Sequence, residues 1–540
     1  MNKKLKILAV LGAVAVVSLG AGAAAACGDT SCKHKNVSHT EAKAATCMSA
    51  GNTEYWQCND CKLYFTDAGC KNETELANTV VAIDASNYDY GAFEYNYTAK
   101  QYEKKCSRNT AEHVITQAAG TEEYPYLISD MKQWVEFAEA HSQPSTQKST
   151  DCYKVTCDLD FSTANAGEKV NVYDFSGTID FDNHKVSGLT MSNTVDPAYY
   201  VRGLFDVVHD ATIKNIDFEA SFFGVNGHIT HLVTILLSGA NVIENATMSG
   251  SAVYSENNAS AFVYMVYPFY AKKDNAAYAG ISQNVTLTMK DCTSKVNMNN
   301  KAGYSAAFVG TVNNGNNNDG YGKTNLNFIN CKNEGTIVAY KNASVLVANP
   351  VAYKFVSGEK GNLTVKNCAN EGVIYYGTAF APVIGYNADT QKVNEDNAAN
   401  VKTGANVKVA SVGALGVSNG NFVIKPVTGA ARYELSFSFV ASKMVGGETF
   451  SGAVGKTVTV TTETQFAVLD FVNAADLEEG DYSKRADGMY VTDDGLHYVF
   501  GVDEAVWVSG SKMTSLPGVI LTAYDNDGQI LAISDYTYSK

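Results

Sequence analysis

Cysteine and histidine are the residues of this chain whose spacing best suits a chemical role. Two residues, Asn59 and Asp60, separate Cys58 from Cys61 and form a turn. At this spacing two thiolates can bind one Zn²⁺. Cys47 and one histidine, either His34 or His39, could complete a tetrahedral site of three sulfurs and one nitrogen. We therefore predict a structural zinc ion near the N-terminus.

A disulfide is the alternative role for the same cysteines. Residues 27–80 form a Cys-rich module that is too small for a large core, so a metal ion or a disulfide would stabilise it. In an oxidising compartment Cys58 could pair with Cys61, or Cys47 with either. No partnering constellation accompanies these thiols, so a catalytic thiol is not expected.

Four aspartates are candidates for acid–base chemistry: Asp158, Asp160, Asp180 and Asp182. Paired carboxylates can cleave a glycosidic bond. However, the first two belong to a predicted strand, and Asp180 and Asp182 flank a turn, where Asp side chains commonly accept backbone hydrogen bonds. The sequence has no phosphate loop, nucleophile elbow or His-Glu-x-x-His motif. Asp180 and Asp182 remain the catalytic candidates, and turn formation is the role that we favour for them.

Tyrosines offer a second kind of candidate site. Aromatic ring faces stack on sugars or on peptide partners and are common at interfaces. The tyrosines that we predict for binding lie in or beside loops of the central region, namely Tyr199, Tyr200, Tyr264, Tyr267 and Tyr270. The alternative is that they pack locally beneath those loops.

The elements that position these residues follow a repeated pattern over residues 121–386. Four similar phrases begin near residues 242, 287, 326 and 363, and each is followed by a second short apolar run. Ala246, Cys292, Cys331 and Cys368 occupy the same place in each phrase, which predicts a column of small side chains pointing inward. Strands this short become stable by stacking on copies of themselves, so the pattern predicts a solenoid.

A helix is predicted at the start of the solenoid. Met131, Trp134, Val135 and Ala138 recur at helical spacing, and Ser129 could cap this helix over residues 130–141. Laid over the first coil, such a helix would cover the open end of the solenoid.

The flanking segments differ from the repeats in composition. Residues 81–120 and 387–406 are polar and read as linkers, and Cys106 in the first could pair with Cys152. Residues 407–540 contain about seven alternating strands with Asp-Gly turns, which predicts an antiparallel β-sandwich. The expected fold class is therefore all-β.

The N-terminus predicts export. Residues 1–26 have a basic head, an apolar middle and small residues at the end, as in a secretory signal peptide. Cys27 could accept a lipid, and we expect membrane attachment only in that case. The net charge of −15 excludes a nucleic-acid partner, because such proteins carry clustered Lys and Arg.

Two stretches resemble known families. The first stretch resembles the opening of a right-handed parallel β-helix of the GLUG-repeat type. The residues that carry this resemblance are Phe175, Gly177, Thr178, Gly188, Leu189 and Gly203–Phe205. The chain departs from the pattern at Asp182-Asn183-His184, where the family prefers glycines. A Cys-rich repeat of exported Gram-positive surface proteins resembles three phrases of this chain, Ala45–Cys47, Glu54–Cys61 and Tyr64–Asp67. The second resemblance implies surface display, and an Ig- or fibronectin-like strand pattern near Ala431 fits the C-terminal sandwich.

The expected function is binding rather than catalysis. We predict a secreted or cell-surface adhesion protein whose ligand is an extracellular glycan or protein. A β-helix polysaccharide lyase or glycoside hydrolase is one alternative, and a structural surface spacer is another.

Overall fold

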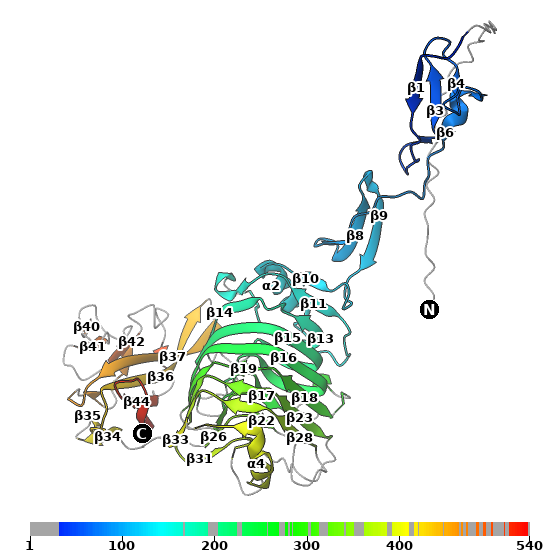
Figure 1. The fold of residues 1–540 in the computed structure, drawn as a ribbon. Helices are drawn as coiled ribbons and strands as arrows, with labels where there is room; N and C mark the ends of the chain where they lie inside the picture. The colour runs from blue at the N-terminus through cyan, green and yellow to red at the C-terminus, as the bar shows by residue number, and fades with distance from the viewer. Residues whose placement is uncertain are drawn as a thin grey trace. The chain divides into compact units, whose positions relative to one another are not determined.

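The protein was examined as a computed structural model (Figure 1). It describes residues 32–537 apart from 166–167, 193–202, 224–228, 256–257, 269–275, 279–280, 283, 301–303, 313–321, 340–341, 350–360, 386–390, 405, 410–414, 419–420, 446–447, 464–465, 468–470, 474–481, 485–489, 493–497, 501–511 and 514–517. The expected signal peptide and Cys27 lie outside the described residues. Among the described residues, no helix is long and apolar enough to cross a membrane.

The chain divides into two compact units. The first consists of Met1–Glu94 and Glu103–Thr116, and the second of Tyr95–Tyr102 and Gln117–Lys540. The Cys-rich module in the first unit has an antiparallel sheet of four short strands in the order β1 (Val37–Thr40), β3 (Tyr55–Cys58), β4 (Tyr64–Phe65) and β5 (Glu73–Thr74). The expected linker contains a further sheet of β7 (Glu94–Asn96), β8 (Gln101–Cys106) and β9 (Asn109–Ala118).

The second unit is built around a sheet in which parallel strands follow one another in chain order. Strand β13 (Val172–Asp180) pairs with β15 (Phe205–Phe223), and β15 pairs with β16 (Val233–Ser255). The stack continues through β18 (Val285–Lys290), β23 (Thr324–Ile329) and β28 (Leu363–Lys366), each parallel to the one before. The predicted mostly-β, solenoid-like stack of parallel strands is thus present (Figure 1).

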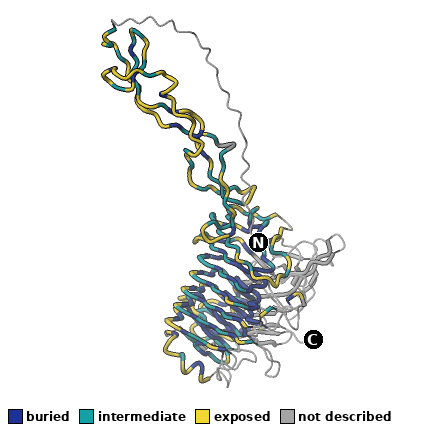
Figure 2. The backbone as a smooth tube through the Cα atoms, turned by 90° about the vertical axis from the view of Figure 1, so that its right-hand side faces the viewer, coloured by how far each residue is buried: buried dark blue, intermediate teal, exposed yellow. Residues whose placement is uncertain are grey.

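Alternating side chains of these strands form one continuous core. In β18 and β23 every second residue is buried, beginning with Val285 and Thr324, which is the period of a strand with one face inward. Figure 2 shows the buried backbone, in dark blue, gathered along the stacked strands. The apolar cluster runs unbroken from Ile128 to Val401, so each coil is stabilised by its neighbours.

The predicted column of small side chains is also present. Thr247, Thr293, Lys332 and Ala369 pair in succession, which places Ala246, Cys292, Cys331 and Cys368 above one another. All four are buried. Each thiol donates to a backbone carbonyl of the preceding coil, as Cys331 does to Met289 O at 3.4 Å. The neighbouring thiol of Cys292 raises the pKa of Cys331, so Cys331 stays a neutral thiol.

A left-handed corner precedes each member of this column and also precedes Ile216, which pairs with Ala246. The corner residues are Asn215, Asn245, Asp291, Asn330 and Asn367, with φ values between 49° and 58°. Asn and Asp adopt this region at lower cost than other residues with a side chain. The corner side chains also bond between coils: Asn330 Nδ2 donates to Asp291 Oδ1 at 2.8 Å, and Asn245 Nδ2 donates to Asn215 Oδ1 at 2.9 Å.

Helix α2 (Met131–Ala140) packs against the first coils, as its apolar spacing predicted. Trp134 is fully buried, and its indole Nε1 donates to Val170 O at 2.9 Å. The cap is Asp130 rather than the expected Ser129, because an Asp130 carboxylate oxygen accepts from Gln133 N at 2.8 Å. Ser129 N instead donates to the Gln133 side chain, so both residues take part in the helix start.

The stack extends past the expected boundary at residue 386. Helix α4 (Gln391–Asn397) lies in the expected linker, and strands β32 (Val401–Lys402) and β33 (Val407–Val409) still pair in parallel with β29 (Cys368–Asn370) and β30 (Val373–Tyr376). Beyond them the sheets are mainly antiparallel.

The largest C-terminal sheet contains four long strands, β36 (Arg432–Val445), β37 (Glu448–Val460), β44 (Gly518–Tyr524) and β45 (Ile530–Thr537). Antiparallel pairing of alternating strands is what the sequence predicted for this part of the chain.

The corner residues yield a testable prediction about stability. Asn330→Ala should lower the free energy of unfolding by about 1–3 kcal/mol, because it loses both the low-cost left-handed backbone and the bond to Asp291. Asn327→Ala is the matched control, because Asn327 also bonds to the preceding coil but lies within strand β23. Chemical denaturation should show a smaller loss for the control and partial recovery in Asn330→Gly. Equal losses for all three variants would contradict the backbone explanation.

Candidate metal centre and binding groove

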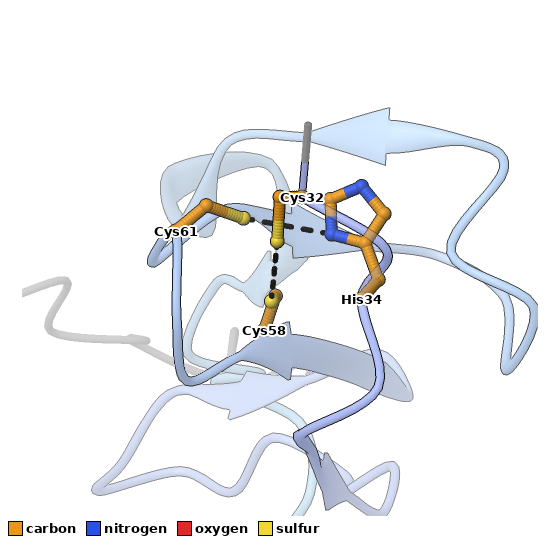
Figure 3. Close-up of side chains that lie close together, drawn as sticks. All are labelled: Cys32, His34, Cys58 and Cys61. Carbon is orange, nitrogen blue, oxygen red and sulfur yellow. Dashed lines mark hydrogen bonds between the residues drawn. The ribbon is translucent and has the colours of Figure 1, made fainter. Parts of the chain in front are cut away.

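Four side chains of the Cys-rich module converge on one point. One ligand atom each from Cys32, His34, Cys58 and Cys61 lies within 4.8 Å of the others, and Figure 3 shows the side chains pointing toward one another. The sulfurs of Cys32 and Cys58 are 3.6 Å apart, and Cys61 Sγ lies 3.5 Å from His34 Nδ1. Two thiolates on a tetrahedral zinc ion would be about 3.8 Å apart, given Zn–S bonds of about 2.3 Å. The set can therefore hold a metal ion.

Local backbone structure positions the four ligands. Cys58 ends β3, and Lys62 N donates to Cys58 O at 2.8 Å in the turn that brings Cys61 back toward it. Lys62 has a φ of 64°, which makes this turn tight. Cys32 and His34 lie just before β1, whose Val37 pairs with Cys58. A small apolar cluster around Phe65 and Cys70 packs beneath the site.

The electrostatics of the site favour a cation. Backbone N–H of Cys61, followed by the His34 side chain, lowers the pKa of Cys58 to about 6. Cys32 behaves oppositely: the backbone N–H of His34 acts to lower its pKa, but burial and the neighbouring sulfurs raise it to about 11. Thiolates crowded this closely repel one another, and a bound divalent cation removes that repulsion.

This site shares three residues with the predicted one. Cys58, Cys61 and His34 are brought together, but the third sulfur comes from Cys32 rather than Cys47. Cys47 lies instead beside Cys106, with 3.7 Å between the sulfurs.

The second predicted histidine also lies elsewhere. His39 Nε2 bonds to Glu54 at 2.8 Å, and its ring stacks on Trp56 with centroids 4.7 Å apart. No sequence motif distinguished Cys32 from the other cysteines, although its Cys-x-His spacing with His34 was a usable signal.

The candidate aspartates have structural partners. Asp158 accepts from Lys185 N at 2.9 Å, and that N–H lowers its pKa. Asp160 accepts from Ser162, whose hydroxyl and backbone N–H lower its pKa.

Asp180 and Asp182 belong to the corner of the stack. Asp180 accepts from Asn215 Nδ2 at 2.7 Å and from Asp182 N at 2.9 Å. Burial acts to raise the pKa of Asp180, but these donors and Lys214 lower it. Asp182 has a φ of 51° and pairs with Lys154 at 2.9 Å. A general acid needs a raised pKa, so Asp180 is better suited to stabilising the corner.

The candidate tyrosines do not form an exposed surface in the described part of the chain. Tyr264 and Tyr267 are only 2% and 6% exposed, and they pack with Tyr278, Val207 and Ile235. Tyr199, Tyr200 and Tyr270 lie outside the described residues.

A different aromatic site lies at the N-terminal end of the stack. We call it the aromatic groove, a cavity of about 410 Å³, which is within the range of small-molecule sites. Its aromatic lining comes from the β7–β8 hairpin, from strands β10 (Tyr126–Ile128) and β11 (Cys152–Val155), and from α2; it comprises Tyr95, Tyr97, Tyr126, Phe137, His141 and Tyr153.

Polar groups surround these rings. Lys100 Nζ and Glu136 form an ion pair of 3.2 Å, and Gln133 and Asp151 also line the groove. Tyr102 donates to Pro125 O at 2.9 Å, which fixes the hairpin beside β10. The sequence did not reveal this groove, because its hairpin falls in the expected linker.

Comparison of the chain with protein-family models and with curated proteins gives no match. The metal centre and the aromatic groove are therefore interpreted from their geometry.

The two histidines of the module provide the test of the metal centre. His34→Ala should lose the bound metal ion to a weak chelator more readily than the wild-type protein, because it removes the imidazole ligand. His39→Ala should retain that ion, since His39 pairs with Glu54. Elemental analysis after dialysis against a weak chelator measures both. Loss of the ion from the His39 variant alone would contradict this ligand set.

Proposed function

We propose that this protein binds extracellular carbohydrate without chemically changing it, and that the sugar occupies the aromatic groove. The observation that carries the proposal is the gathering of tyrosine rings around one cavity beside polar side chains. Sugar rings present apolar C–H faces and hydroxyl edges, so aromatic faces and hydrogen-bonding groups together suit them.

The tyrosine rings of the groove contact one another and remain partly exposed to solvent. Tyr97 is 43% exposed, and the rings of Tyr126 and Tyr153 lie 5.3 Å apart at an angle of 32°. Burial raises the pKa of Tyr95, of Tyr153 and of the adjacent Tyr102, the last to about 12. These phenols therefore stay neutral near pH 7, and those of Tyr95 and Tyr153 keep an O–H that can donate to a ligand.

Binding is favoured over catalysis because of the partners of the candidate carboxylates. Asp158, Asp160 and Asp180 accept hydrogen bonds that lower their pKa values. The carboxylates that line the groove are Glu136, which is paired with Lys100, and Asp151. Asp158, Asp160 and Asp180 therefore lack the raised pKa that the general acid of glycoside hydrolysis requires.

The finer structural assignments belong to the same proposal. We interpret the parallel stack as a right-handed β-helix, the C-terminal sheets as a β-sandwich, and the ion of the metal centre as structural Zn²⁺. Zinc is favoured because three thiolates and one imidazole suit a tetrahedral, redox-inert ion. Export to the cell surface would place the groove where extracellular glycans occur, and an extracellular protein is the alternative ligand.

Tyrosine substitutions test the proposed ligand. Tyr97→Ala and Tyr126→Ala should each weaken binding to glycans on an array by about three- to tenfold, the value of one stacking ring. Tyr55→Ala is the control, because Tyr55 lies on β3 in the other unit. Retained glycan binding in a Tyr97/Tyr126 double variant would contradict the site. Binding to host-protein arrays alone would favour the protein ligand.

Turnover assays test the absence of chemistry. The protein should release no reducing ends or unsaturated sugars from a panel of acidic and neutral polysaccharides. Asp182→Asn should leave glycan binding unchanged, because its exposed pair with Lys154 is worth only about 0–1 kcal/mol. Turnover that disappears in Asp180→Asn or Asp182→Asn would instead establish a carbohydrate-active enzyme.

A further inference from the structure

A second group of metal-ligating side chains lies in the first unit. Cys47 precedes β2 (Gly51–Asn52), Cys106 ends β8, and His113 lies on β9. The sulfurs of Cys47 and Cys106 are 3.7 Å apart, and one ring nitrogen of His113 lies within 4.8 Å of both. Residues separated by 59 positions in the sequence are thus brought together by the fold.

The surroundings of this group favour a ligand. Both cysteines are buried, and the Nδ1 atom of His113 is buried without a hydrogen-bond partner among the described residues. A buried polar atom left unpaired lowers stability, and coordination of a metal ion by that atom removes the penalty. The edge contact between Tyr88 and His113, with ring centroids 5.0 Å apart, holds the imidazole in place.

A backbone N–H group points at the sulfur of Cys106. The backbone N–H of Asp89 donates to Cys106 Sγ at 3.5 Å. Backbone N–H groups directed at a sulfur are a common outer shell of thiolate metal ligands.

We propose that Cys47, Cys106 and His113 form a second zinc site. The separation of the two sulfurs matches the roughly 3.8 Å of two thiolates on a tetrahedral zinc ion, as it does in the Cys32 site. A disulfide would instead bring the sulfurs to about 2.05 Å and leave His113 without a role.

Zinc binding at this site replaces two thiol protons with the metal ion. The Cys47 and Cys106 thiols release two protons to solvent as two Zn–S bonds form, and the neutral imidazole of His113 adds one Zn–N bond. The described residues supply three ligands, a number that zinc sites complete with water or one further donor. The ion fastens the Cys-rich module to the β8–β9 hairpin, a role independent of the proposed carbohydrate binding.

The zinc content of the full chain tests this site. Native mass spectrometry of protein produced with zinc should show two ions per chain. Cys106→Ser and His113→Ala should each show one, and Cys152→Ser, a partly buried cysteine of the other unit, should keep two. A wild-type chain with one ion or none, or a Cys106→Ser chain that keeps two, overturns the proposal.

Thiol labelling of the wild-type chain keeps the test independent of variant folding. Peptide mapping should show Cys47 and Cys106 protected from an alkylating reagent until a strong chelator is added. A Cys47–Cys106 disulfide in the mapped peptides overturns the proposal, and so does full labelling of both thiols before chelation. Because Cys32, Cys58 and Cys61 give separate peptides, the result for each site is read separately.

Discussion

The parallel stack depends on a backbone corner that only a few residue types adopt at low cost. At each repeat an Asn or Asp turns the chain with a positive φ, and the next residue enters the core as Ile216, Ala246 or a cysteine. The corner side chains then bond to those of the neighbouring coil. A single coil would leave these groups unpaired, so the corners and the core form together.

This constraint determines which polar residues are available for function. Asp180 and Asp182 attract attention in the sequence, yet their hydrogen bonds and backbone angles belong to the first corner. The start of the stack is different, because helix α2 and strand β10 must cover the first coils without being copies of them. The aromatic groove forms in this irregular part.

The features that could be predicted from the sequence are those that repeat locally. The inward column of Cys292, Cys331 and Cys368 followed from a pattern that recurs along the chain. The residues of the candidate metal centre could be predicted only in part, because Cys58 and Cys61 are close in the sequence whereas Cys32 lies 26 residues before Cys58. Loop position alone could not distinguish a buried tyrosine such as Tyr264 from an accessible one such as Tyr97.

We infer that the corners form the scaffold and that binding occurs where the stack begins. Hydrogen–deuterium exchange of the full chain, with and without a glycan that it binds on an array, tests this claim most directly. Backbone amides of residues 95–102 and 126–141, which line or border the groove, should exchange more slowly when the glycan is added. Slower exchange confined to the corners around Asn183, Asn215 and Asn245, with no change at the groove, would contradict it.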